Sequence, residues 1–239
     1  MTSLVLLLTL VFLDSIVGFV SGFGTSTLLL PVLLLWYPID TALILTSFVH
    51  LLNNISKAAF FFKQLSWHFF LLFAVPAVIC SLIGAQFVFL VNRTLLARGI
   101  GLLLLVYILL QLLWHGTLVI KKSIWLAVGG GFYGLMEGLT GIGGAFRATL
   151  LSSYAMAPAA FVATNGAIAL VVDIARLTTY TRLQTNPAFS FWTYGLVAIM
   201  TLGGSLVGKI LVEYLPVRTI KRIVFWVIIL ASIKLIIAP

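Results

Sequence analysis

Two glycine-rich interruptions of apolar sequence hold most of the residues that could bind a ligand. The first is GFVSGFGTSTLLLP at positions 18–31, and the second is EGLTGIGGAFRATL at positions 137–150. The first turn of a half-helix that follows such a break presents free N–H groups and a partial positive charge, which suit the oxygen atoms of an anion. We therefore predict an anion site. Its candidate residues are Gly22, Gly24, Thr25, Ser26, Gly141, Gly143, Gly144, Arg147 and Asn165.

Two interpretations of the glycines are open from the sequence. Glycine allows positive φ and close approach of a ligand to the backbone. Small residues also let membrane helices pack tightly against one another, as in GxxxG contacts. Because both breaks fall inside apolar segments that are too long for one membrane crossing, we favour the binding site.

Arg147 follows the second break by a few residues and is the strongest single candidate. An arginine within an apolar segment is costly in lipid, by about 2.5–3.5 kcal/mol on insertion scales. Its planar guanidinium suits a sulfonate or a carboxylate bidentately. The alternatives are an ion pair with Glu137 and snorkelling to the interface. Asn165 could complete the anion site with its amide, or could form a hydrogen bond between helices.

Three carboxylates lie within apolar segments and are candidates for coupling to H⁺ or Na⁺: Glu137, Asp14 and Asp173. Asp173 has Arg176 three residues later, which favours a local ion pair. Asp14 could instead face the bundle or lie near an interface. The three histidines, His50, His68 and His115, have no metal-ligand spacing, so we predict interfacial positions and no metal site. We expect no cofactor.

The elements that must position these residues are membrane helices. The chain is 62% hydrophobic and 8% charged over 239 residues, with a net charge of +9, which excludes an ordinary soluble domain. Basic residues at the ends of apolar runs suit lipid headgroups rather than nucleic acid. The predicted fold is an all-α polytopic membrane protein. Its apolar runs cover about 3–36, 41–62, 67–91, 95–114, 123–155, 157–180, 189–212 and 217–238.

The first and fifth runs exceed the roughly 20 residues of one crossing, and each contains a glycine break. A constant offset of 119 residues relates Gly22 to Gly141 and Lys57 to Arg176. We therefore predict one transmembrane domain, 1–239, with a first repeat at 1–119 and a second at 120–239. Each repeat would have one broken or re-entrant helix and three transmembrane helices. We favour inverted repeats, as in many transporters; parallel repeats are the alternative.

Four segments carry a resemblance to a known family: GLMEGLTGIGGAF (134–146), GFVSGFGTSTLLLP, SLIGAQ (81–86) and GSLVGK (204–209). Together they resemble the TauE/SafE family, also called the 4-toluene sulfonate uptake permease family, over essentially the whole chain. The resemblance implies an inner-membrane, multi-pass transporter of sulfite, sulfonates or related organic anions.

The chain departs from the family pattern at both breaks. Ala145 replaces a glycine at the second break, and Thr25 and Ser26 replace glycines at the first. Arg147 stands opposite Leu28 in the repeat. We therefore expect an asymmetric site weighted toward the second break.

The function predicted from these features is secondary transport of a small anion by alternating access, near the bilayer midplane. A passive anion channel is the alternative, and a homo-oligomer is left open. An enzyme is not expected: a serine hydrolase built on Ser21 would need a histidine base, and none of the three is placed convincingly.

Overall fold

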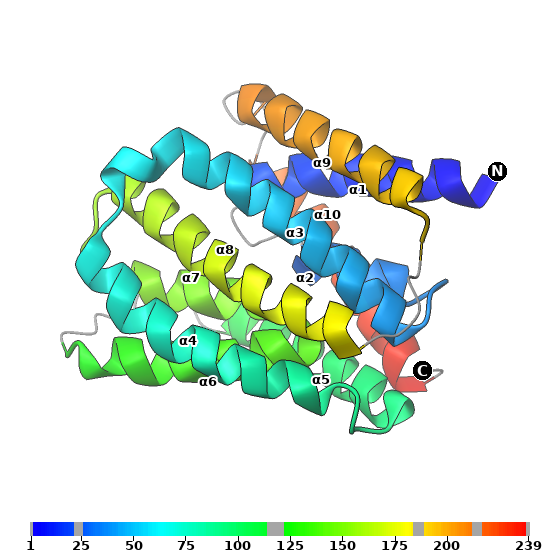
Figure 1. Cartoon of the computed structure of the whole chain (residues 1–239), viewed down its shortest axis with the longest axis horizontal. Coiled ribbons are helices and arrows are strands. Elements are labelled where there is room, and N and C mark those ends of the chain that lie inside the picture. The colour runs from blue at the N-terminus through cyan, green and yellow to red at the C-terminus, as the bar shows by residue number, and fades with distance from the viewer. Residues whose placement is uncertain (1, 22–25, 114–121, 184–188, 212–216, 238–239) are drawn as a thin grey trace.

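The computed structural model describes residues 2–21, 26–113, 122–183, 189–211 and 217–237. Over these residues its regular structure is entirely helical, which confirms the predicted all-α class (Figure 1). The helices are α1 (Thr2–Ser21), α2 (Ser26–Leu33), α3 (Ile39–Phe61), α4 (Trp67–Phe87), α5 (Arg93–Leu113), α6 (Ile124–Thr140), α7 (Gly144–Ser152), α8 (Pro158–Leu183), α9 (Phe191–Leu211) and α10 (Val217–Ile237), and a short 3-10 helix, η1 (Phe62–Gln64), follows α3.

Four helices of the described chain, α4, α5, α8 and α9, are long and apolar enough to cross a membrane. Shorter apolar stretches lie in α1 and α10, at Leu4–Phe19 and Phe225–Ile237. The outer faces of the long helices are apolar: Leu71, Val75 and Ile79 of α4 are all more than half exposed. Polar side chains instead lie inside the bundle, as expected for a protein whose solvent is lipid.

Helices α4 and α6 run parallel and lie side by side. Glycines on α6 let the two backbones touch. A Cβ atom on Gly134 would lie 2.0 Å from the carbonyl oxygen of Ala77, and one on Gly138 would lie 2.3 Å from that of Ser81. No side chain larger than hydrogen fits at these positions. We call this contact the α4–α6 seam.

Helices α1 and α9 form a second seam of the same kind. A Cβ on Gly204 would lie 2.6 Å from the carbonyl oxygen of Phe12, and one on Gly208 would lie 3.0 Å from that of Ile16. Residue numbers rise together on both helices, so this α1–α9 seam is also parallel.

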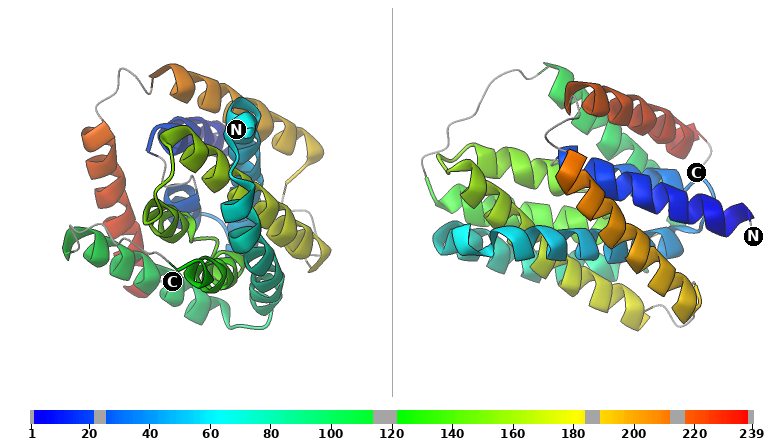
Figure 2. Two further views of the ribbon diagram at one scale, coloured as in Figure 1. Left: turned by 90° about the vertical axis from the view of Figure 1, so that its left-hand side faces the viewer. Right: turned by 90° about the horizontal axis from the view of Figure 1, so that it is seen from above.

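Helices α3 and α8 pack against each other in the middle of the bundle and run in opposite directions. The amide of Ser66, just after α3, donates to Thr164 Oγ1 near the start of α8 at 3.1 Å. Further back along α3, Asn54 donates to Asp173 at 2.9 Å. Helix α5 packs against α10, and α9 and α10 lie on the outside of the bundle (Figure 2).

Helices α6 and α7 form a hairpin. Helix α6 ends at Thr140, and Gly141 has φ 70°, a left-handed conformation that glycine adopts readily. The chain then runs back along α6. Leu150 of α7 packs on Gly129 near the start of α6, and beyond α7 the hydroxyl of Tyr154 donates to the carbonyl of Lys122 at 3.0 Å.

Helix α2 packs against α7, and its Leu30 lies beside Gly141, with Cδ2 3.3 Å from the Cβ position of that glycine. Of the residues predicted at the first break, Gly22, Gly24 and Thr25 lie outside the described residues. Ser26 is the first residue of α2.

Candidate functional site

Arg147 lies in the first turn of α7 and is buried, with 1% of its surface exposed. Its Nε donates to Asn165 Oδ1 at 2.8 Å, and its Nη1 donates to the hydroxyl of Tyr133. The guanidinium carbon also lies 5.0 Å from the centre of the Tyr133 ring. Both hydrogen-bond partners are neutral. Among the described residues, no carboxylate forms an ion pair with Arg147.

Lys57 of α3 adds a second positive charge near Arg147. Its Nζ donates to the carbonyl of Gly18 at 3.0 Å, and its Cβ lies 3.5 Å from the Cβ position of Gly166, the neighbour of Asn165. The charges of Lys57 and Arg147 repel each other. We call Arg147, Tyr133, Asn165 and Lys57 the Arg147 site; its excess of positive charge favours an anionic ligand.

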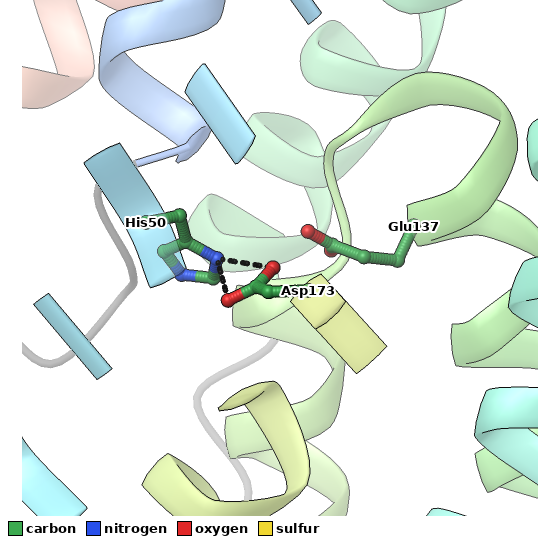
Figure 3. Close-up of side chains that lie close together, drawn as sticks. All are labelled: His50, Glu137 and Asp173. Atoms are coloured by element: carbon green, nitrogen blue, oxygen red, sulfur yellow. Dashed lines mark hydrogen bonds and ion pairs between the residues drawn. The ribbon is translucent and has the colours of Figure 1, made fainter. Parts of the chain in front are cut away.

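A second buried cluster surrounds the Asp173 carboxylate of α8. His50 Nδ1 lies 3.0 Å from Oδ1 and 2.9 Å from Oδ2 of Asp173 (Figure 3). Asn54 Nδ2 donates to Oδ2 at 2.9 Å, Arg176 Nε donates to Oδ1 at 3.0 Å, and Arg176 Nη2 lies 2.9 Å from the same oxygen in an ion pair. Arg176 Nη1 also lies 3.1 Å from Glu137 Oε1. These five residues form the Asp173 network.

His50, Glu137 and Asp173 offer ligand atoms that all lie within 4.8 Å of one another, a spacing that a metal ion could bridge. Arg176, however, reaches both carboxylates with its guanidinium. A positive charge is therefore already present where a metal ion would supply one, and a metal would have to displace it. We interpret the group as an ion-pair network and not as a set of metal ligands.

Gly143 connects the Arg147 site to the Asp173 network. A Cβ at this position would lie 2.7 Å from Glu137 Oε2 and 2.8 Å from the ring of Tyr133. The Glu137 carboxylate therefore lies against the N-terminal end of α7, where the helix dipole favours a negative charge. Any larger side chain at position 143 would displace groups of both clusters.

Asp14 of α1 is a third buried carboxylate, 4% exposed, and neither of its oxygens has a hydrogen-bond partner among the described residues. Its charge is attracted to that of Lys57. Nearby, Asn53 links α1 to α9, because its amide group bonds Ser15 at 3.3 Å and Ser205 at 2.6 Å.

The structure brings several of the predicted site residues together. Gly143 and Gly144 begin α7, and Asn165 bonds Arg147. Gly141 lies at the reversal of the chain, with its Cβ position 3.1 Å from Arg176 Nη1. The predicted Asp173–Arg176 pair is confirmed. Among the residues that the structure describes, the charged group that acts on Asp14 is Lys57.

Two of the sequence-based alternatives are wrong. Glu137 pairs with Arg176 and not with Arg147, because the hairpin places its carboxylate on the side of α6 that faces α8. His50 is fully buried and not interfacial, because the Asp173 carboxylate gives its ring a polar partner inside the bundle.

Sequence reasoning missed Tyr133 and Lys57 as site residues. The available signal for Tyr133 was its position one helical turn before Glu137, on the same face of α6. For Lys57 it was a lysine in an apolar segment, 119 residues before Arg176.

An apolar exterior around a core of buried charges defines a multi-pass membrane protein. Comparison with known protein families identifies the family to which the chain belongs. The family described as "Sulfite exporter TauE/SafE" matches residues 6–235, so the chain belongs to this exporter family, as the resemblance in sequence implied. No curated protein and no solved structure shows significant similarity.

Proposed function

We propose that the protein is a secondary transporter of small anions of the sulfite or sulfonate type, located in the inner membrane. The observation that carries this proposal is the buried Arg147, whose hydrogen-bond partners are both neutral. The family name adds sulfite as the first substrate to test.

The argument is electrostatic. A buried cation is unfavourable unless a negative charge compensates it, and removing the partner of a buried pair costs about 3–5 kcal/mol. Arg147 therefore lies in a state that an incoming anion would stabilise. Tyr133 and Asn165 hold the guanidinium in place, so that it keeps one orientation, and Lys57 adds a second charge nearby. The free N–H groups in the first turn of α7 are further donors for anion oxygens.

Inverted repeats with re-entrant hairpins complete the proposal and supply a route for alternating access. The inverted arrangement of the repeats is supported by pairs of helices that correspond across the 119-residue offset. Helices α3 and α8 correspond in sequence and run antiparallel. The α1–α9 seam corresponds to the α6–α4 seam, and Ile16 and Leu135, which are 119 residues apart, contact Gly208 and Gly84 respectively. In this interpretation α1–α2 is the counterpart of the α6–α7 hairpin, with the first break at 22–25.

The experiment is flux into proteoliposomes, measured with labelled sulfite, methanesulfonate, sulfoacetate and acetate. We expect saturable uptake of sulfite or methanesulfonate that Arg147→Ala abolishes. Arg182→Ala is the matched control, because Arg182 is an exposed arginine near the end of α8. Unaltered flux in Arg147→Ala would remove this residue from the site.

A passive channel would use the same residues, and the same vesicles distinguish it from a carrier. A carrier shows saturation and accelerated exchange when unlabelled anion is present on the opposite side. Single-channel current without saturation would establish the channel instead.

A further inference from the structure

We propose that His50 is the proton-binding group of this protein and takes up one proton when an anion occupies the Arg147 site. The inference rests on the proposed function, and it adds an assignment of the coupling ion and of the residue that carries it. It is based on the charges, contacts and burial of the two clusters.

With the three carboxylates ionised and His50 neutral, the charges of the two clusters and of Asp14 balance when no anion is bound. The cations are the buried Arg147 and Arg176 and the partly buried Lys57, and the carboxylates are the buried Asp14, Glu137 and Asp173. The charges cancel over the two clusters together but not within either cluster. Lys57 and Arg147 with Asp14 leave one positive charge at the Arg147 site, whereas Arg176 with Asp173 and Glu137 leaves one negative charge in the Asp173 network.

A bound monoanion removes this balance. It neutralises the excess charge at the Arg147 site, and the negative charge of the Asp173 network then has no counterpart in a medium where unpaired charge is strongly unfavourable. One proton added to the network restores neutrality. The two clusters meet at Gly143, between Glu137 and Tyr133, so the compensation acts over a short distance.

Two groups of the network that can accept a proton have buried polar atoms without a hydrogen-bond partner among the described residues, namely the Glu137 carboxylate and the His50 ring. Positive charge already faces the Glu137 carboxylate, because Arg176 Nη1 lies 3.1 Å from its Oε1 and the N-terminal end of α7 lies against its Oε2. We therefore assign the proton to His50.

The Nδ1 atom of His50 lies 2.9–3.0 Å from both oxygens of Asp173, closer than to Arg176 Nη2 at 3.4 Å, so that nitrogen carries a hydrogen and donates it to the carboxylate. Its Nε2 is buried and has no hydrogen-bond partner among the described residues. In neutral His50 this nitrogen holds a lone pair, and protonation there leaves the bond to Asp173 intact. The proton comes from water on the side from which the anion enters, and no other bond forms or breaks.

The charged neighbours of His50 are Asp173 and Arg176 of α8 and Glu137 of α6. Other titratable groups lie around these three: Tyr133 of α6 and Tyr180 of α8 act on Arg176, and Lys57 of α3 acts on Asp173 and links it to Asp14 of α1 and Arg147 of α7. The hydroxyl of Tyr180 donates to the carbonyl of Gly138. Only the carboxylates oppose Arg176 in the network, and together they exceed its charge by one.

The test is proton uptake during methanesulfonate binding, because this anion stays singly charged throughout the pH range of the assay. Titration calorimetry of the detergent-solubilised full chain, in two buffers of different ionisation enthalpy, gives the number of protons taken up per anion. We expect about one proton for the wild type, and an affinity that falls by up to about tenfold per pH unit on the alkaline side. In His50→Gln we expect proton uptake near zero.

Two further variants keep the result decisive if His50→Gln does not fold. Glu137→Gln removes the excess negative charge of the network, so it should bind methanesulfonate without proton uptake. His68→Gln alters an exposed histidine of α4 and should keep the wild-type proton number.

The outcomes separate the two proposals. Methanesulfonate binding with no proton uptake in the wild type, or with full uptake in either His50→Gln or Glu137→Gln, overturns the inference and leaves the transporter proposal intact. Absence of binding and of flux for every anion in the panel overturns both.

Discussion

The two buried arginines should respond in opposite ways to the same substitution. Arg147→Met and Arg176→Met each replace a buried guanidinium by an apolar side chain. Arg147 has the neutral partners Tyr133 and Asn165, whereas Arg176 lies between the carboxylates of Asp173 and Glu137. The structure therefore predicts that Arg147 serves ligand binding and that Arg176 serves stability.

The magnitudes follow from these partners. Loss of Arg176 leaves two buried carboxylates uncompensated, and breaking a buried pair costs about 3–5 kcal/mol. Loss of Arg147 leaves two neutral groups unpaired, at about 1–3 kcal/mol each, but also removes an uncompensated buried charge, so we expect a net change within about 1 kcal/mol. For the anion, two charge-assisted hydrogen bonds of about 1.5–3 kcal/mol each would be lost. The dissociation constant should then rise by about 150-fold or more.

Both quantities can be measured on the same detergent-solubilised samples. Unfolding is followed by the fluorescence of the six tryptophans, and methanesulfonate binding by calorimetry. Excess anion should stabilise the wild type, by about 2.7 kcal/mol at one hundred times the dissociation constant, and should not stabilise Arg147→Met. An Arg147→Met protein that binds the anion normally and loses as much stability as Arg176→Met would refute the assignment.

Three further substitutions test the packing around the site. Gly143→Ala should reduce anion flux strongly, because its Cβ would lie 2.7 Å from Glu137 Oε2 and 2.8 Å from the Tyr133 ring. The control in the same flux assay is Gly99→Ala, since there is open space around position 99. Gly134→Ala should destabilise the α4–α6 seam by about 1–3 kcal/mol through overpacking, measured as the unfolding midpoint, whereas Gly195→Ala, which meets nothing within 4 Å, should not. Asn53→Ala should cost about 0.6–2 kcal/mol by breaking the link from Ser15 to Ser205; a midpoint equal to that of the wild type would show that this link contributes nothing.

The lengths of the apolar runs and the placement of the glycines predicted where the second break falls. The second break was expected around Gly141–Gly144, and α6 ends at Thr140 while α7 begins at Gly144. The reason is local: glycine in a left-handed conformation ends a helix whatever the rest of the chain does. Arg147 was identified for an equally local reason, since a charge in an apolar segment needs a specific environment.

The pairing of charges could not be predicted in the same way. Glu137 has Arg147 ten residues away and Arg176 much further along the chain, and the sequence suggested only the nearer arginine as its partner, as an alternative to anion binding by Arg147. The reversal after Thr140 instead turns the Glu137 carboxylate toward α8. The burial of His50 depends likewise on α3 and α8 lying against each other, a contact across 123 residues that no local pattern encodes.

The two glycine seams determine which parts of the molecule are stiff. At the α4–α6 and α1–α9 seams the helices touch backbone to backbone, so a shift of one helix by a turn would force a Cβ atom into the opposite main chain. Helices α3 and α8 meet through side chains, including the bonds of His50 and Asn54 to Asp173, so a shift between them requires rotamer changes and no main-chain clash. Each stiff pair also combines one helix from each half of the sequence. The mechanical units of this bundle are therefore interlocked pairs drawn from both halves, and neither half could move as an independent body.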